Sequence, residues 1–216
     1  MSHLKRKSME KSWPLPRKGT KYVLSAYPGK KSGMSMPLGI ILRDVLKITS
    51  KRKETKALLH NKEIKVNGKI AEEEKLPVGL FDVLSIPKLS KNYIITFNES
   101  GKISCEEINE KDSHLKICKI TGQKILKKGI KQINCIDGRN FLSKEKVSIK
   151  DSIVLDLKDN KILKILPFKV GSEALIIGGA HVGEKGKISE ITDDKVKMNI
   201  KNKAFEIQER NIVVVK

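Results

Sequence analysis

Large apolar side chains are scarce in this chain of 216 residues: aromatics make up 4% of the sequence and hydrophobic residues of all kinds 38%. So little apolar material favours several small cores over one large enzyme core. No segment approaches the roughly 18 consecutive apolar residues of a membrane-spanning helix, which excludes an integral membrane protein of that kind. The basic start MSHLKRK leads into no apolar segment, so we expect no secretory signal.

Cysteine is also rare, and the three cysteines stand at 105, 118 and 135. An odd number at long spacings, without a C-x-x-C pair, predicts no disulfide framework and indicates a reducing compartment. Each cysteine lies in a stretch of alternating apolar residues, so we expect small buried strand residues. Neither these nor the four scattered histidines show metal-ligand spacing, and the sequence predicts no metal site and no cofactor. The histidines are His3, His60, His114 and His181.

Acidic residues are outnumbered, 25 against 45 Lys and Arg, which gives a formal net charge of +20 and a pI near 9.8. A surface this positive predicts a polyanionic partner, and nucleic acid is the usual one. Residues 1–60 alone carry a net charge of +12. Within them, residues 1–36 combine several Pro and Gly with few aliphatic residues, which predicts a basic extended N-terminal tail that a partner orders.

The next segment, residues 37–91, predicts two helices, a hairpin and a strand. Apolar residues at helical spacing predict a helix over 37–47, and a second, basic helix follows over 51–60. Asn67-Gly68 between alternating residues is a strong hairpin signal. A further strand is expected over 81–86.

Short segments of alternating apolar residues dominate from residue 92 onward. Glycine and Asp-Gly turns separate them, a spacing typical of a small barrel or sandwich. We divide this part into a central β domain, residues 92–170, and a C-terminal unit, residues 171–216. The fold class is therefore expected to be α+β and mostly β. The predicted strands cover 93–97, 103–105, 115–120, 130–136, 147–157, 162–168, 173–177, 186–191, 195–200, 203–207 and 212–215.

Residues 37–86 carry LRDVL at 42–46, a basic second helix, IKVNGK at 64–69 and FDV at 81–83. In this order these features resemble the alpha-L RNA-binding domain. The resemblance implies docking on helical RNA, largely by phosphate contact and shape. A basic helix start also offers backbone N–H groups to a phosphate. The other interpretation of the charged run KRKETK at 51–56 is a solvated helix face.

The C-terminal unit contains LIIGGAHVGEKGKI at 175–188. This run resembles a KOW motif, which implies a small SH3-like barrel. Glycines at 179, 183 and 186 allow tight turns and the close approach of another backbone, and for Gly186 we expect turn geometry. The run is no nucleotide-binding loop, because GxxxxGK[ST] fails where His181 and Ile188 stand.

The stretch KKGIKQINCIDGRN at 127–140 is the most specific motif. It looks like the KKG…QLNLHDGRN signature of small-subunit ribosomal protein four of the archaeal–eukaryotic type. HLKR at 3–6 followed by Trp13, and VGLFDV at 78–83, also resemble that family. The resemblance runs in order through nearly the whole chain. The sequence departs from the family at Lys216, because it lacks the longer basic extension of eukaryotic members.

RNA contacts are predicted for the polar, basic and aromatic side chains that these segments carry. In the tail and the alpha-L region they are Lys5, Arg6, Lys7, Trp13, Arg17, Lys18, Lys30, Lys31, Arg43, Lys51, Arg52, Lys53, Lys56, His60, Lys65 and Lys69. In the two later parts they are Lys127, Lys128, Arg139, Asn140, His181 and Lys185.

Two of these residues leave alternatives open. Arg139 could reach a phosphate or pair with Asp137, whose Asp-Gly sequence is typical of a hairpin turn. Trp13 could stack on a base, fill a pocket on a neighbouring protein, or fold back onto the alpha-L helices.

The function predicted is that of a structural constituent of the small ribosomal subunit, not an enzyme. Its expected partners are small-subunit rRNA and neighbouring ribosomal proteins, with no membrane, no small-molecule substrate and no homo-oligomer. The expected location is the cytoplasm, in that subunit. The alternatives are an RNA-modifying enzyme, for which the sequence offers no catalytic constellation, and a free KOW-type RNA-binding factor.

Overall fold

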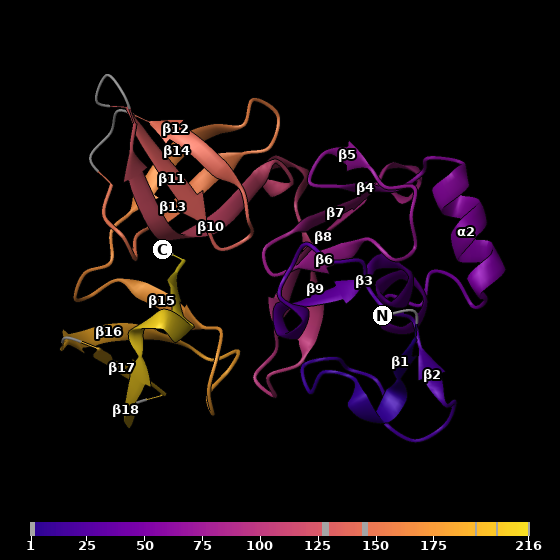
Figure 1. Cartoon of the computed structure of the whole chain (residues 1–216), viewed down its shortest axis with the longest axis horizontal. Helices are drawn as coiled ribbons and strands as arrows, with labels where there is room; N and C mark the ends of the chain where they lie inside the picture. The colour runs from indigo at the N-terminus through magenta and orange to yellow at the C-terminus, as the bar shows by residue number, and fades with distance from the viewer. Residues whose placement is uncertain (1–2, 127–129, 144–146, 193, 202, 216) are drawn as a thin grey trace. The chain divides into compact units, whose positions relative to one another are not determined.

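The computed structural model describes residues 3–126, 130–143, 147–192, 194–201 and 203–215. Lys127 and Lys128, both predicted to contact RNA, lie outside the described residues. The chain forms two compact units (Figure 1). The first runs to residue 98 and includes 102–114, and the second holds 99–101 and the chain from 115 onward. Strands dominate both units, as the α+β, mostly β prediction requires. In the stretches covered here, no helix is long and apolar enough to cross a membrane.

The N-terminal segment packs on the first unit. It contains two short strands and two 3-10 turns, namely β1 (Leu4–Lys5), β2 (Tyr22–Val23), η1 (Arg6–Ser8) and η2 (Ser32–Met34). β1 pairs antiparallel with β2. Met9 and Trp13 are both buried, at 3% exposure each. Composition predicted an extended segment that cannot build a core of its own. Two large side chains suffice to dock it, because they join a core that later residues build.

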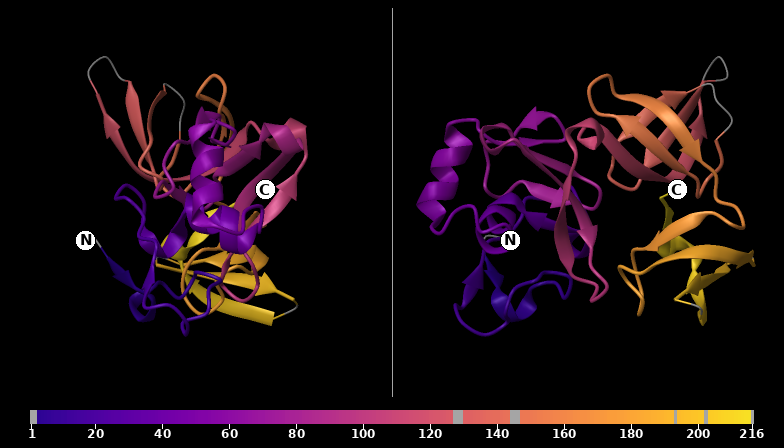
Figure 2. Two further views of the ribbon diagram at one scale, coloured as in Figure 1. Left: turned by 90° about the vertical axis from the view of Figure 1, so that its right-hand side faces the viewer. Right: turned by 180° about the vertical axis from the view of Figure 1, so that it is seen from behind.

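The helical part follows, with the elements β3 (Ser35–Pro37), α1 (Leu38–Ile40), the π-helical turn η3 (Ile41–Val45) and α2 (Arg52–His60). The predicted helix over 37–47 therefore widens after one turn, where the Leu46 N–H donates to the Ile41 carbonyl at 2.8 Å. Its apolar side chains Leu38, Ile41 and Leu42 are fully buried. The second helix agrees with prediction and packs beside η3 (Figure 2).

The first unit is completed by strands β4 (Lys65–Val66), β5 (Lys69–Ile70), β6 (Pro77–Gly79), β7 (Val83–Ile86), β8 (Lys91–Phe97) and β9 (Ile103–Ile108), with turns η4 (Pro87–Leu89) and η5 (Glu110–Asp112). Five of them form a sheet in the order β5-β4-β7-β8-β9, while β6 pairs with β3. Asn67 and Gly68 both have positive φ, 52° and 77°, which confirms the predicted hairpin turn. Because β8 pairs with β7, this sheet continues past residue 91.

The second unit begins with strands β10 (Leu115–Ile125), β11 (Lys131–Cys135), β12 (Asn140–Ser143), β13 (Ser152–Asp156) and β14 (Lys161–Leu166). They form one antiparallel sheet in the order β12-β11-β10-β13-β14. The sequence did not predict β12, whose four residues follow the Asp-Gly turn. The buried core on this sheet consists of Cys118, Ile120, Ile133, Cys135, Val147, Ile153 and Leu155.

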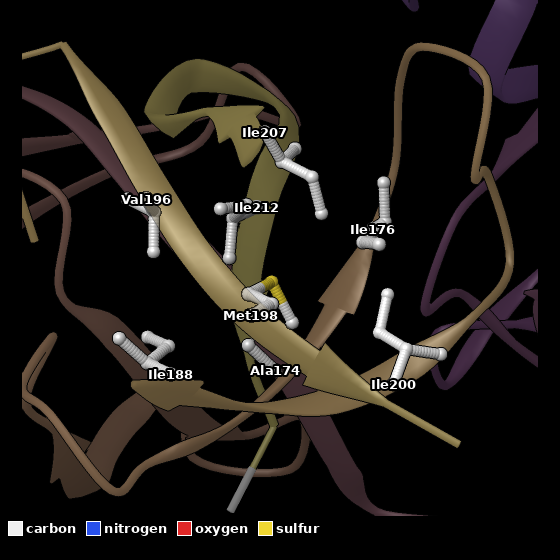
Figure 3. Packing of buried hydrophobic residues seen from close by; sticks show 8 residues of the cluster. All are labelled: Ala174, Ile176, Ile188, Val196, Met198, Ile200, Ile207 and Ile212. Atoms are coloured by element: carbon white, nitrogen blue, oxygen red, sulfur yellow. The ribbon is translucent and has the colours of Figure 1, made fainter. Parts of the chain in front are cut away.

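The C-terminal strands are β15 (Glu173–Ile176), β16 (Lys185–Ile191), β17 (Lys195–Ile200), β18 (Lys203–Gln208) and β19 (Ile212–Val214), with the turn η7 (Glu209–Asn211). Their order is β18-β17-β16-β15-β19, and alternate residues fill one core (Figure 3). Gly186 lies in β16 and not in a turn, which corrects the prediction. A Cβ there would lie 2.6 Å from the Asn199 carbonyl oxygen, so close strand packing requires the glycine.

Candidate nucleic-acid interface

The start of α2 presents a group of exposed cations: Lys51, Arg52, Lys53 and Lys56. The Glu54 carboxylate accepts hydrogen bonds from the N–H groups of Ser50, at 2.8 Å, and Lys51, at 3.1 Å. These bonds lower the pKa of Glu54. The N–H groups of Ser50 and Lys51, just before the helix, are thus already in use. The lysine side chains beside them are exposed and available to a phosphate.

Arg52 differs from its neighbours because it holds a buried partner. Its Nε lies 3.0 and 2.9 Å from the two carboxylate oxygens of Glu74, and its Nη2 also donates to Glu74. The Glu74 side chain is 7% exposed and the Arg52 side chain 57%. The hydrogen bonds from Arg52 lower the pKa of Glu74. Arg52 therefore connects α2 to the segment before β6.

A surface pocket of about 810 Å³ lies between α2 and residues 72–75. One wall carries cations of α2, and the other carries the exposed ring of Tyr27, with Lys75 Nζ 5.6 Å from the ring centroid. An aromatic face beside cations suits an unpaired base. Tyr27 was not among the residues predicted to contact RNA, because spacing does not reveal that its ring is exposed beside a basic helix. The pocket is lined by Tyr27, Arg52, Lys56, Ala57, His60, Lys62, Glu72, Glu73, Glu74 and Lys75.

The hairpin after α2 presents Lys65 and Lys69, both exposed. A buried network fixes its turn: Asn67 Nδ2 donates to Asp82 Oδ1 at 2.9 Å, and Asn67 Oδ1 accepts from the Val83 N–H at 3.0 Å. The Asp82 carboxylate also pairs with Lys30. The hairpin lysines thus sit on a rigid support. Lys30, predicted to contact RNA, is instead joined to a carboxylate that is fully buried.

The two arginines of the tail donate hydrogen bonds to backbone carbonyls of the tail itself. Arg6 Nη1 donates to the Pro16 carbonyl at 2.8 Å, and Arg17 donates to the carbonyls of Lys7 and Met9 at 3.0 and 3.1 Å. Four of the tail lysines predicted to contact RNA are exposed; they are Lys5, Lys7, Lys18 and Lys31.

Trp13 is buried in the fold, although it was predicted to contact RNA. Its indole Nε1 donates to the Ser35 carbonyl at 2.9 Å. Of the three alternatives that the sequence left open, a fold-back agrees with this burial, with the indole bonded to β3. The prediction that Trp13 stacks on a base is therefore wrong for this conformation, because the side chain is only 3% exposed.

The remaining predicted contacts are dispersed. In the first unit, half-buried Arg43 pairs with its neighbour Asp44, with Nη2 to Oδ2 at 2.7 Å, and His60 is exposed at the end of α2. In the second unit, Arg139 Nε lies 3.6 Å from Asp137 Oδ2, so the pairing alternative holds. His181 Nδ1 lies 3.2 Å from Glu184 Oε2 and its ring packs on Phe205. Asn140 and Lys185 are exposed.

The predicted residues of α2 and of the hairpin that follows it are all exposed, on two successive elements of the first unit. Exposed lysines on rigid elements are the feature by which proteins track a nucleic-acid backbone. These features define a basic, mostly β protein of the nucleic-acid-binding class.

Comparison with known proteins identifies the family. The family model described as ribosomal family S4e matches residues 89–162, and the model for the KOW motif matches residues 170–216. The small ribosomal subunit protein eS4 of Archaeoglobus fulgidus is 38% identical over 186 residues, covering 86% of this chain and 78% of that protein. The eS4 protein of Methanospirillum hungatei is 39% identical, covering 87% and 79%. The chain belongs to the S4e family of ribosomal proteins.

The fold supports the same assignment. The crystal structure of 30S ribosomal protein S4e from Thermoplasma acidophilum superposes with a TM-score of 0.73 at 27% sequence identity. The match covers 84% of this chain and 95% of that one. The family predicted from the signature at 127–140 is therefore confirmed.

Proposed function

We propose that this chain is a structural protein of the small ribosomal subunit, which binds and braces small-subunit rRNA during assembly and translation. The observation that carries the proposal is family membership over 86% of the chain, with relatives named as small ribosomal subunit proteins. The charge of +20 fits a polyanionic partner. The cytoplasm, where ribosomes work, is the proposed location.

The main RNA contact in this proposal is the surface formed by α2 and the hairpin β4-β5. Lys51, Lys53 and Lys56 would reach phosphates from the helix, and Lys65 and Lys69 from the hairpin. Residues 37–91 would thus act as an alpha-L-type domain that recognises RNA by backbone and shape. His60 and Tyr27 border the pocket beside α2. An unpaired nucleotide is the ligand that this pocket would take.

The other parts would add contacts along the chain. We propose that the exposed tail lysines of residues 1–36 meet further phosphates, and that Asn140, His181 and Lys185 do so in the central domain, 92–170, and the KOW barrel, 171–216. Neighbouring ribosomal proteins would meet the less basic surfaces, and the chain would act as a single copy. No feature of the described residues favours a modifying enzyme or a free factor over this assignment.

Sedimentation tests the proposal. A native extract of the source organism is run on a sucrose gradient, before and after a high-salt wash, and fractions are probed for this chain. We expect stoichiometric migration with the small subunit that survives the wash. Migration away from the subunit at low salt would overturn the proposal and favour a free factor or a modifying enzyme.

A further inference from the structure

The core of the second unit contains a group of metal-ligating side chains that spacing in the sequence does not show. The Sγ atoms of Cys118 and Cys135 and a carboxylate oxygen of Asp137 all lie within 4.8 Å of one another. Both cysteines are buried, at 1% and 5% exposure. We propose that Cys118, Cys135 and Asp137 form a binding site for a soft divalent cation, Zn²⁺. This site is independent of the RNA-binding surface proposed above.

Strand register explains how the three residues meet. Cys135 on β11 pairs with Ile120 on β10, and Cys118 lies two residues before Ile120 on the same face. The turn after β11 then returns Asp137 toward this face. The Gly138 N–H donates to the Cys135 carbonyl at 3.0 Å, and Asp137 Oδ1 accepts from the Arg139 N–H at 3.0 Å. The backbone therefore holds the carboxylate in place.

The distances suit a small tetrahedral ion. Zinc binds thiolates at about 2.3 Å and carboxylates at about 2.1 Å, which puts neighbouring ligand atoms about 3.5–3.8 Å apart. Cys118 Sγ already lies 3.4 Å from Asp137 Oδ2. The remaining separations are at most 4.8 Å, so these ligand atoms would draw together by up to about 1 Å on binding. Water or an external ligand would fill the fourth position.

Two cations already border the carboxylate of this group, so zinc can enter only if it replaces other positive charge. Asp137 Oδ2 lies 2.6 Å from the Nζ of Lys116, which is 1% exposed, and 3.6 Å from Arg139 Nε. One carboxylate thus faces two cations in a largely buried place. Zn²⁺ binding replaces two thiol protons: two S–H bonds break, two Zn–S bonds form and two protons leave to solvent. The net charge of the site is unchanged by that exchange, so burial does not oppose it.

Of the three ligand groups, the Cys118 thiol is the one that hydrogen bonding and burial keep in its protonated form. The hydrogen bond with Cys135, together with burial, raises the pKa of the Cys118 thiol. Burial works to raise the pKa of Asp137 as well, but Lys116 outweighs burial and leaves that pKa below its ordinary value. Two thiolates favour zinc over Ca²⁺ or Mg²⁺, which prefer oxygen ligands.

The test uses the purified full chain, reduced and free of metal. Zn²⁺ is added under anaerobic conditions, and retained zinc and released protons are measured after removal of loose metal. We expect about one zinc and about two protons per chain. Addition of Co²⁺ should give a thiolate-to-cobalt charge-transfer band.

Matched variants assign the site. Cys118→Ser and Cys135→Ser should each lower zinc affinity more than tenfold, whereas Cys105→Ser, at the third cysteine, should leave it unchanged. Asp137→Asn should lower affinity about 10- to 100-fold, with circular dichroism as the check that it is folded. Absence of retained zinc in the folded, reduced wild type would overturn the proposal. Equal zinc retention in all variants would mean surface binding only and would also overturn it. A Cys118–Cys135 disulfide in the protein as isolated would overturn it as well.

Discussion

Arg52 and Glu74 form a two-pronged ion pair that joins α2 to the segment before β6, with Nε 3.0 and 2.9 Å from the two carboxylate oxygens. The pair gives Arg52 a role in folding, whereas the exposed lysines around it can reach a ligand. Arg52→Gln should therefore lower the free energy of unfolding by about 1 kcal/mol, because the half-exposed guanidinium limits the effect.

The difference in unfolding free energy between wild type and Arg52→Gln should also depend on pH. The pKa of Glu74 is lower in the folded chain than its ordinary value of 4.5, so the pair stabilises the fold above that pH. As pH falls through the folded pKa, Glu74 is protonated and wild type should approach the variant. Urea unfolding of both proteins at about pH 7 and pH 3 measures this. An equal difference at both pH values would contradict it.

Unlike Arg52, Lys53 and Lys56 should contribute to RNA binding and not to the stability of the fold. The double variant Lys53→Gln/Lys56→Gln should keep its stability and bind a small-subunit rRNA fragment more weakly. The slope of log affinity against log salt should flatten by roughly 0.7–0.9 for each phosphate that the variant no longer neutralises. Filter binding or fluorescence anisotropy over a salt series gives the slope. The control, Lys195→Gln/Lys203→Gln, removes the same charge from exposed strand positions, and an identical weakening there would mean that only net charge matters.

Local signals allowed much of the fold to be predicted. Asn67-Gly68 predicted its hairpin because both residues readily adopt the positive φ that the turn requires. The strands of the KOW unit followed from alternation, since one face of that sheet covers a single apolar core.

Long-range pairings could not be predicted in this way. Trp13 bonds to the carbonyl of Ser35, and Arg52 to Glu74, each 22 residues away. The approach of Cys118 to Cys135 depends on strand register. Charge alone also could not reveal the ion pair of Lys30 with the buried Asp82, since lysine is equally basic in either setting. Which exposed lysines touch RNA stays a prediction.

Trp13 should contribute strongly to stability although it lies in the basic tail. Trp13→Ala should lower the free energy of unfolding by about 3–5 kcal/mol, because it removes a buried indole and leaves a cavity. Tyr22→Ala is the control, since Tyr22 is 45% exposed and should change stability by about 0.5 kcal/mol or less. Denaturant unfolding measures both. A Trp13 variant as stable as wild type would show that the tail is not docked in solution.

Lys119 should make stability depend on alkaline pH. Its ammonium donates to the carbonyls of Glu209 and Ile212 at 2.9 and 2.7 Å, and burial lowers its pKa to about 8. Since the unfolded pKa is about 10.4, the unfolded chain binds the extra proton between these values. The contribution of Lys119 to stability should therefore increase as pH rises from about 8 to about 10.

The variant Lys119→Met isolates this contribution. Lysine titrations elsewhere in the chain cancel when wild type and variant are compared at each pH. The stability of wild type relative to Lys119→Met should rise across the window, as measured by urea unfolding at about pH 7.5 and pH 10. A constant or falling difference would contradict the assigned burial.

Gly186 should be intolerant of any side chain because two strands meet there. A Cβ would lie 2.6 Å from the Asn199 carbonyl oxygen and 2.8 Å from the side-chain atom Ile200 Cγ1, and the Asn199 backbone cannot move without disturbing the β16-β17 pairing. Gly186→Ala should therefore destabilise the chain by about 1–3 kcal/mol. The matched control is Gly122→Ala, where a Cβ would meet its nearest atom at 3.7 Å. Thermal unfolding should separate the two variants by several degrees, and equal midpoints would mean that β16 and β17 lie farther apart than the structure places them.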